Sequence, residues 1–405
     1  MEIAEDADTH RLAFDYVRTA AKMKITAIET LPVSVGPGYD YAVIVVLVRT
    51  DEGLTGIGEA SLAGSGRGVL GILDHFDELL VGQDPAKIEH WWSEMVRGTF
   101  WSTGQVIMSA VAGIDIALWD LKGKRLGVPV YDLLGGPTRE RVRVYRHLAG
   151  NSAEELADDA LRWHEQGFTA LRFGPLAAFD DHSLAHWDPQ ASIVQTIKAT
   201  ESLRLAVGDD VDLILDAHTM FSPAEAAYLG HALEPYRLYF YEDPIRPLNP
   251  QSLRLVRDKV NLPIATGEQL AHKWEFQPLI ENELIDYLRI DMVHAGGITE
   301  AKKILASGEI HGQRSALHHA SSPVNGTACL HVDLAVPNFG IQEWMELEPL
   351  YELFPNAPRA QDGYVSPPSG PGLGLEFDER EARKRPSRDA GLPQRYWPDG
   401  SVGDY

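Results

Sequence analysis

The most constraining feature of this sequence is a series of acidic and histidine residues that end short apolar runs at nearly equal intervals. Intervals of 23 to 27 residues separate the members of the series, which are Asp216, Glu242, Glu268, Asp291, His318 and Glu343. A strand, a helix and two loops fill about that length in a (β/α)₈ barrel, which carries its functional residues at the carboxyl ends of its strands. The spacing therefore predicts six successive barrel strands, each with a functional residue at its end.

Two further strands are expected ahead of that series. The runs VRVYRHLAG, from Val142, and TALRFGP, from Thr169, have strand-like composition, and helical stretches separate the predicted strands. Strands that alternate with helices are typical of parallel βαβ units. One such helix follows Ser152, which is placed to cap it. The fold class predicted for residues 142–345 is therefore α/β, an eight-stranded barrel of the (β/α)₈ type.

The chain before the barrel has a different pattern. Residues 25–59 alternate as strands that form a hairpin, and residues 69–126 place apolar side chains at helical spacing. Between them, residues 61–67 are rich in glycine and serine and are expected to form a mobile loop. Strands first and helices afterwards predict a separate α+β domain over residues 23–141.

Both ends of the chain are expected to lie outside these two units. Residues 1–22 are acidic and are predicted to be a loose extension. Residues 346–405 are rich in proline and glycine and show no period, so they are predicted to pack back on the N-terminal domain.

Composition excludes several classes of protein. The formal net charge of −23 disfavours nucleic acid and anionic membranes as partners, because both attract clustered Lys and Arg. No apolar run is long enough to span a membrane, and the first residues lack the apolar core of a secretory signal. The one cysteine, Cys329, lies in an apolar run and is expected to be buried and inert. We therefore expect a cytoplasmic protein without disulfides.

Three of the strand-end acids predict a metal site. Asp216, Glu242 and Glu268 end consecutive strands, so their carboxylates are expected to converge at the barrel mouth. Carboxylates held together repel one another unless a cation compensates them. Oxygen ligands without cysteine suit a hard ion such as Mg²⁺.

Histidines near strand ends are candidates for proton transfer. His218 lies two residues after Asp216, and strand alternation predicts that both face the mouth. There His218 would be a fourth ligand, a general acid or a structural donor. His318 ends the strand beside that of Asp291, and a neighbouring carboxylate raises the basicity of an imidazole, as a general base requires. The same alternation directs His319 away from the mouth.

Two other histidines lie near strand ends. His147 ends the first barrel strand and is a candidate for substrate contact. His294 is expected to have a structural role. No Ser/His/Asp arrangement and no nucleotide-binding glycine fingerprint stand out.

These motifs together resemble the enolase superfamily, specifically the mandelate racemase-like acid-sugar dehydratases of the galactonate and mannonate type. The resemblance covers about residues 23–378 and rests on the order and spacing of TDEGLTGIGEA, AGIDIALWDLKGKRLG, LDAH, YEDP, TGE, IDMVHAGGITE and PNFGIQE. It implies an α+β capping domain, completed by the C-terminal tail, over a modified (β/α)₈ barrel.

The resemblance also implies a chemistry. One Mg²⁺ per subunit would bind Asp216, Glu242 and Glu268, while Asp291 and His318 would form the base and Glu343 would lie near the substrate carboxylate. His218 would protonate the hydroxyl that leaves when a sugar acid is dehydrated to its 2-keto-3-deoxy acid. The alternatives are an epimerase or cycloisomerase of the same superfamily, or a regulatory homologue with little turnover. We expect a homo-oligomer whose partner is a small acid sugar.

Two departures bear on this chemistry. Strand two carries Arg172 and Gly174 where racemases of the family carry a Lys-x-Lys pair, which argues against racemisation. The loop after that strand, FGPLAAFDDHSLAHWDP, lacks the tyrosine expected in the mannonate branch.

Overall fold

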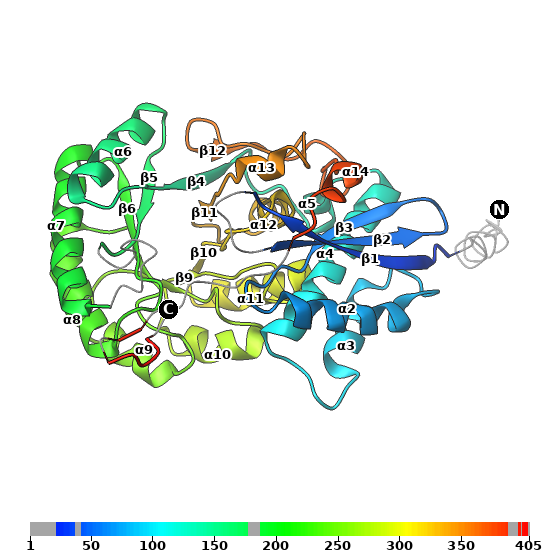
Figure 1. Cartoon of the computed structure of the whole chain (residues 1–405), viewed down its shortest axis with the longest axis horizontal. Coiled ribbons are helices and arrows are strands. Elements are labelled where there is room, and N and C mark those ends of the chain that lie inside the picture. The colour runs from blue at the N-terminus through cyan, green and yellow to red at the C-terminus, as the bar shows by residue number, and fades with distance from the viewer. Residues whose placement is uncertain (1–21, 37–41, 177–186, 388–395, 398, 404–405) are drawn as a thin grey trace, which may run out of the picture.

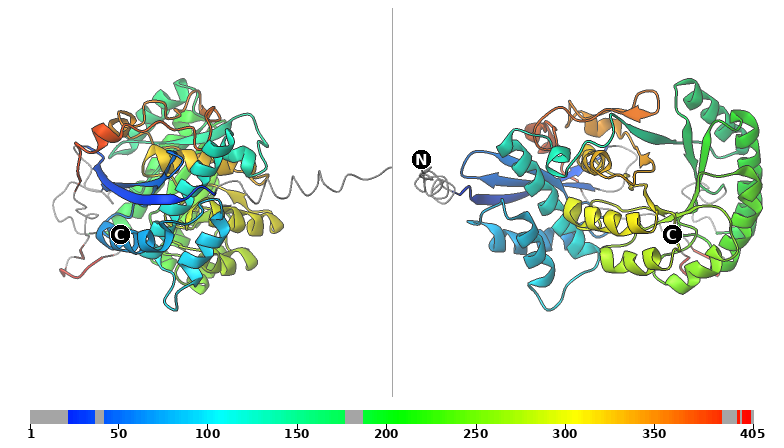
Figure 2. Two further views of the ribbon diagram at one scale, coloured as in Figure 1. Left: turned by 90° about the vertical axis from the view of Figure 1, so that its right-hand side faces the viewer. Right: turned by 180° about the vertical axis from the view of Figure 1, so that it is seen from behind.

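The computed structural model describes residues 22–36, 42–176, 187–387, 396–397 and 399–403. A barrel forms one half of the molecule and a smaller α+β domain lies beside it (Figure 1). The right-hand view in Figure 2 shows the same division from behind.

Eight parallel strands form the barrel and follow one another in chain order. They are β4 (Val142–His147), β5 (Ala170–Phe173), β6 (Asp212–Asp216), β7 (Phe240–Glu242), β8 (Ile264–Thr266), β9 (Tyr287–Leu288), β10 (Arg314–Ser315) and β11 (Gln342–Glu343). β11 pairs with β4, and a parallel bridge between Ser315 and Phe339 joins β10 to the segment that leads into β11. The predicted eight-stranded barrel is confirmed.

Helices connect these strands and cover the outside of the barrel. They are α6 (Ala153–Glu165), α7 (Pro189–Val207), α8 (Pro223–Leu233), α9 (Pro250–Arg257), α10 (Lys273–Glu281), α11 (Gly297–Ile310) and α12 (Pro323–Ala335), with a 3₁₀ turn at Glu234–Tyr236. Ser152 caps α6 as predicted, since its Oγ accepts a hydrogen bond from the Glu155 backbone at 3.1 Å. Four helices begin with proline directly after a capping residue, where its fixed φ suits the first turn.

Alternation along each strand separates two apolar layers and places the site. In β6, Leu213 and Leu215 pack outward against the helices, whereas Ile214 points into the barrel. The inward layer is formed by Tyr145, Ala170, Ile214, Phe240, Ala265, Ala316 and Ile341. Residues two positions further along the strands share the inward direction at the mouth; they include His147, Arg172, Asp216, Glu242, His318 and Glu343. These residues form a polar layer at the mouth of the barrel. The apolar layer lies directly beneath it and forms its floor.

Within the described residues, the α+β domain consists of an antiparallel sheet and four helices. Its elements are β1 (Ile25–Ser34), β2 (Ala42–Thr50), β3 (Thr55–Glu59), α2 (Gly66–Leu80), α3 (Ile88–Arg97), α4 (Gln105–Leu126) and α5 (Val130–Leu133). The predicted loop over residues 61–67 is wrong at its end, because α2 begins at Gly66. The hairpin turn was predicted correctly, since it joins β2 to β3.

The C-terminal tail joins both parts of the molecule. It contains α13 (Glu348–Tyr351), β12 (Tyr364–Val365) and α14 (Glu379–Ala382). β12 pairs with β4 of the barrel, and Glu379 accepts a 2.6 Å hydrogen bond from Arg49 Nη2 on β2.

Some predictions fall outside the described residues. These are the extension over residues 1–21, residues 177–186 of the loop after β5, and residues 388–395, 398 and 404–405 of the C-terminal segment. In the described part of the chain, no helix is both long enough and apolar enough to cross a membrane.

Close packing of β3 on α4 generates a test of this fold. A Cβ added at Gly58 would lie 1.9 Å from the carbonyl oxygen of Gly113, a backbone atom in the middle of α4. We expect Gly58→Ala to lower the free energy of unfolding by about 1–3 kcal/mol, measured by urea denaturation. Gly71→Ala is the control, because no atom lies within 4 Å of its added Cβ and alanine favours the helix. Equal stability of the two variants would contradict the packing.

Candidate active site

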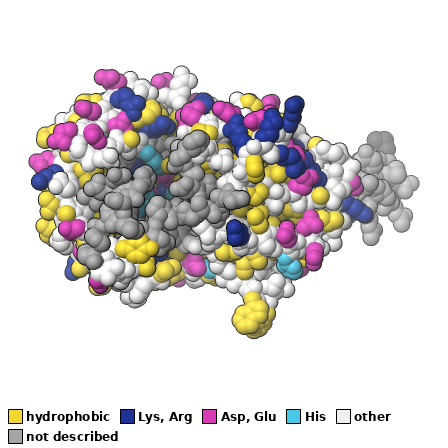
Figure 3. Space-filling model, in the orientation of Figure 1, with side chains coloured by type: hydrophobic (Ala, Val, Ile, Leu, Met, Phe, Trp, Pro, Cys, Tyr) yellow, Lys and Arg dark blue, Asp and Glu magenta, His cyan; other side chains and the backbone are white. Residues whose placement is uncertain are grey.

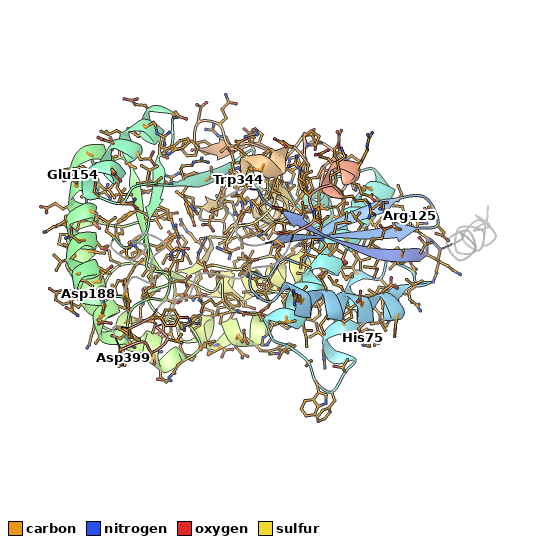
Figure 4. All side chains as sticks on the ribbon, in the orientation of Figure 1. His75, Arg125, Glu154, Asp188, Trp344 and Asp399 are labelled. Atoms are coloured by element: carbon orange, nitrogen blue, oxygen red, sulfur yellow. The ribbon has the colours of Figure 1, made fainter. Side chains whose placement is uncertain are left out.

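The polar layer lies at the carboxyl ends of the barrel strands, where this fold keeps its active sites. Trp344, which directly follows Glu343, lies in the middle of the molecule between the barrel and the α+β domain (Figure 4). Glu154 and Asp188, at the starts of α6 and α7, lie toward the outer edge of the barrel (Figure 4).

Three buried carboxylates gather where β6 and β7 end. Asp216, Glu242 and Asp243 each offer an oxygen, and these oxygens lie within 4.8 Å of one another. Neither carboxylate oxygen of Glu242 meets hydrogen-bond geometry, although Oε1 forms an ion pair with Arg289, and Asp243 Oδ2 has no hydrogen bond. Burial raises the pKa of both Glu242 and Asp243 well above the usual range. Buried acids that are short of donors are the environment that a hard cation satisfies.

Glu268 was predicted to complete this group but lies beside it. Its Oε2 is 3.5 Å from His318 Nε2 and 3.6 Å from Arg289 Nη2, on the side of the mouth formed by β9 and β10. Ala265 is the inward residue of β8, and Glu268 lies an odd number of residues after it, so alternation would point Glu268 outward. Glu268 also follows Gly267, whose φ is +138°. The alternation of side chains along a strand, which predicts the inward direction of Asp216 and Glu242, therefore does not predict the direction of Glu268.

A fully buried arginine provides the counter-charge to this layer. Arg289 Nη2 forms an ion pair with Glu242 and donates to Glu343 Oε2 at 2.8 Å. Its Nη1 donates to the carbonyl oxygens of Ala316 and Leu317 at 3.1 and 3.3 Å. Burial lowers the pKa of Arg289, but the charges of Glu242 and Glu343 outweigh that effect and raise it. The guanidinium thus joins strands from opposite edges of the acidic cluster.

On the β5 and β6 side, Arg172 lies between Asp216 and His218. Arg172 Nη2 forms an ion pair with Asp216 and lies 2.9 Å from His218 Nε2, which in turn is 3.0 Å from Asp216 Oδ2. A guanidinium only donates hydrogen bonds, and a carboxylate only accepts them. Nε2 therefore bonds to Arg172 when it is unprotonated and to Asp216 when it carries a proton. Burial raises the pKa of Asp216, but the charge of Arg172 outweighs it and lowers the value.

His218 reaches the mouth, but not for the reason predicted. β6 ends at Asp216, and His218 lies in the turn beyond it with a left-handed φ of +47°. Its backbone N–H donates to Asp216 Oδ1 at 2.8 Å, which fixes that turn. Alternation along a strand therefore does not place His218.

His318 and Asp291 form a hydrogen-bonded pair on the opposite side of the barrel. His318 Nδ1 lies 2.5 Å from Asp291 Oδ2, and the other ring nitrogen faces Glu268. Asp291 also accepts from the Val293 backbone at 2.7 Å, which orients its carboxylate. Burial lowers the pKa of His318, but the charges of Glu268 and Glu343 outweigh it and raise the value to about 10.

His319 points away from the mouth. It is buried against Trp344, with Nε2 3.2 Å from the carbonyl oxygen of Ser322, and burial lowers its pKa to about 4. A neutral ring behind the barrel wall has no access to the carboxylates.

Glu343 and His147 form a second pair in the layer. Glu343 Oε1 lies 2.7 Å from His147 Nε2, and burial lowers the pKa of His147 with help from the charge of Arg172. His294 Nδ1 lies 3.4 Å from Asp291 Oδ2, beside the His318 pair.

A link from the α+β domain supports the loop after His318. Glu59, which ends β3, is fully buried and accepts from Ser322 Oγ at 2.5 Å and from the Asn325 backbone at 3.1 Å. Ser322 is the capping residue of α12, so a carboxylate of one domain satisfies a helix start in the other.

A cavity of about 720 Å³ adjoins the layer, between the start of α6 and the middle of α7. Arg172 and His218 line its inner end, and Asn151, Lys198 and Ser202 line its outer part. The cavity therefore offers hydrogen-bond donors and acceptors beside the mouth.

Sequence reasoning missed two residues of this layer. Asp243 directly follows Glu242, so alternation would point it outward, but a φ of +38° turns it into the mouth. Arg289 lies two residues before Asp291, and the same period that placed Asp291 inward predicts the inward direction of Arg289. The single buried cysteine, Cys329, was predicted correctly.

Comparisons with known proteins agree with this geometry. Residues 155–382 match the family described as enolase C-terminal domain-like. Residues 19–135 match the mandelate racemase / muconate lactonizing enzyme N-terminal domain.

Similar proteins span nearly the whole chain. A D-mannonate dehydratase of Caulobacter sp. (strain K31) is 38% identical over 389 residues, covering 90% of this chain and 96% of the relative. A D-galactonate dehydratase family member of Streptomyces bingchenggensis is 38% identical over 405 residues, covering 94% and 98%. A solved structure of an enolase from Pantoea ananatis, with bound D-gluconate and Mg, has a TM-score of 0.88 and 35% identity and covers 95% of this chain and 100% of its own.

The role of Arg289 as a buried counter-ion can be measured. We expect Arg289→Met to lower the free energy of unfolding by about 3–5 kcal/mol, because Glu242 and Glu343 lose their compensating charge in a buried site. Arg257→Met is the control, since its partly exposed pair with Asp286 is expected to contribute about 1 kcal/mol or less. Chemical denaturation of both variants makes the comparison. An Arg289→Met protein as stable as the control would refute the role.

Proposed function

The chain belongs to the mandelate racemase and muconate lactonizing enzyme group of the enolase superfamily, and from that premise we propose that it is a Mg²⁺-dependent acid-sugar dehydratase. Such a hydro-lyase converts a sugar acid to its 2-keto-3-deoxy acid. One observation carries the proposal: the His318–Asp291 pair and the His218–Arg172 pair lie on opposite sides of the acidic barrel mouth, His318 beside Glu268 and His218 beside Asp216. That arrangement separates a proton acceptor from a proton donor.

A sugar acid is the substrate class that the site and its relatives support. Relatives carry the names D-mannonate dehydratase and D-galactonate dehydratase family member, and a structural neighbour holds D-gluconate. The cavity beside Arg172 and His218 offers polar side chains to a polyhydroxylated chain. We propose an aldonic acid of this kind and a reducing, cytoplasmic setting.

The donor set fits a magnesium ion. We propose Asp216, Glu242 and Glu268 as its ligands, with Asp243 beside them. When bound, the ion supplies positive charge that compensates these acids and stabilises negative charge developing on the substrate carboxylate. Glu268 is preferred to Asp243 because Asp243 already accepts a hydrogen bond from Thr266 Oγ1.

His318 is proposed as the base. Asp291 holds its Nδ1, so Nε2 is the nitrogen that faces the mouth and accepts the proton from C2 of the sugar acid. The negative charges of Glu268 and Glu343 favour the protonated form of the His318 ring. Positive charge that compensates these two acids favours the neutral ring, which is the form that can accept a proton. Buried Arg289 contributes part of that compensation.

His218 is proposed as the acid. The electron pair left at C2 forms a C2–C3 double bond as the C3–O bond breaks, and His218 gives the departing hydroxyl a proton, so that water leaves. The enol that remains tautomerises to the 2-keto product. Arg172 lies 2.9 Å from His218 Nε2. A guanidinium does not act as a base at neutral pH, which disfavours racemisation at this position.

Solvent deuterium exchange separates the two histidines. With D-mannonate, D-gluconate or D-galactonate, we expect the wild type to form the 2-keto-3-deoxy acid from at least one. His218→Asn should then lower dehydration by about 10²–10⁴-fold while exchange at C2 persists, because only the acid is lost. His318→Asn should lose both, measured by NMR of substrate and product.

The reverse pattern would overturn the assignment. Exchange that survives in His318→Asn but is lost in His218→Asn would make His218 the base. No 2-keto acid from a wider set of aldonic and aldaric acids with Mg²⁺ would favour a regulatory homologue, and an epimer as product would identify an epimerase.

Magnesium binding tests the ligand set independently of turnover. We expect Mg²⁺ alone to raise the melting temperature of the wild type, and Glu242→Gln to abolish that rise, because it removes a central buried ligand. Glu268→Gln should weaken Mg²⁺ at least about tenfold, since a ligand charge is lost, whereas Asp243→Asn should weaken it less. The opposite order for the last two variants would make Asp243 the third ligand.

A further inference from the structure

A short loop of the α+β domain projects away from the rest of the molecule. It joins α3 to α4 and carries Phe100 and Trp101, whose side chains are 89% and 82% exposed. The loop stands out at the lower edge in Figure 1, and a hydrophobic knob projects at that place in Figure 3. We call residues 98–104 the knob. Two adjacent aromatic side chains exposed to this extent are costly in water and mark an interaction site.

The knob has a defined conformation. The rings of Phe100 and Trp101 pack edge to face with centroids 5.0 Å apart, and Thr99 Oγ1 donates to the Trp101 carbonyl oxygen at 2.7 Å. The base of the loop is held as well, because Gln105 Nε2 donates to the Gln269 carbonyl oxygen of the barrel at 2.6 Å. A preformed aromatic pair loses little conformational entropy when it binds.

A complementary groove lies on the neighbouring surface of the barrel. A cavity of about 290 Å³ opens between α10 and α11, and its lining includes Trp274, Ile304 and Ile310. The side chain of Ile310 is 84% exposed and that of Trp274 is 44% exposed. The groove therefore offers apolar surface with room for an aromatic side chain.

The helix that leads into the knob contacts both helices that line the groove. Glu89 of α3 forms an ion pair with Lys303 of α11, and Trp92 Nε1 donates to the Gly296 carbonyl oxygen at 2.9 Å. Lys273, at the start of α10, lies over the Trp92 ring at 4.8 Å. A two-fold axis near both features would place each knob against the groove of the other copy, which is the requirement for a closed symmetric contact.

Charge favours these surfaces for self-association. The chain carries a formal net charge of −23, so two copies repel each other unless they meet where acids are few. The knob contains no charged residue. The groove lining includes one acid, Glu281, together with Lys273 and His311.

Area favours a reciprocal contact. Aromatic side chains bury about 150–250 Å² each, so one knob supplies on the order of 400 Å² and a comparable groove area. That total is below the roughly 1,200 Å² that a stable interface requires, whereas two knobs in two grooves exceed it. We propose that the knob of one copy inserts between α10 and α11 of a second copy, whose own knob inserts in return.

Sedimentation velocity tests this contact on the full chain. We expect the wild type to form dimers or larger assemblies, and Phe100→Ser with Trp101→Ser to raise the dissociation constant at least about 100-fold, because buried aromatic anchors dominate interfaces. Ile310→Glu, which places charge in the groove, should act similarly. Leu205→Ser is the control: Leu205 is 80% exposed on α7, and its replacement should change nothing.

Mixing the variants sharpens the test. The knob variant keeps an intact groove and the Ile310→Glu variant keeps an intact knob, so an equimolar mixture can form one of the two contacts. The mixture should associate more tightly than either variant alone and more weakly than the wild type, because one contact buries about half of the area. Circular dichroism confirms that each variant is folded. Wild-type mass in the folded knob variant, or a monomeric wild type, would overturn the proposal. So would Trp101-dependent sedimentation of the wild type with anionic vesicles, which would make a membrane the occupant.

Discussion

Burial of Arg289 is the interaction on which the barrel mouth depends. One guanidinium inside the protein contacts Glu242 and Glu343 and lies near Glu268, so acids from three strands share a single positive charge. Several carboxylates this close would otherwise repel one another in a medium that screens charge poorly. Arg289 compensates only part of the acidic charge. The remaining excess of negative charge beside Asp216 is what suits the mouth to a divalent cation.

Much of the fold could be predicted from the sequence because two periodic patterns determine it: the spacing of the strand-end residues and the alternation of side chains within each strand. The interval of 23 to 27 residues fixed the βα units, and alternation within each strand fixed which side chains face inward. Ile214 and Asp216 illustrate this, since one belongs to the apolar floor and the other to the polar layer. Residues inside strands therefore matched the expectation. So did His318, which lies beyond β10 in an isolated parallel bridge with Asp291 and faces inward while His319 does not.

Prediction failed where the strands end. His218 and Asp243 have left-handed φ values, and Glu268 follows a glycine at +138°, so their directions depend on turns and not on strand alternation. The contacts of Arg289 and Glu59 join residues far apart in the chain, and no local pattern reveals them. The apolar floor of the site is thus its most predictable part. The least predictable part is the set of turns after the strands, which determine the directions of the carboxylate and imidazole side chains.

The carboxylate of Glu59 has a consequence for how such enzymes diversify. It belongs to the α+β domain, yet it satisfies the start of α12 directly after the loop that carries His318. The two domains are therefore coupled at this point by a buried hydrogen-bonded group. A chimaera that took its capping domain from another protein would have to inherit a matching Glu59 and Ser322 together, or leave a helix start unsatisfied in its core. Recombination at this boundary is constrained by one hydrogen-bonded carboxylate.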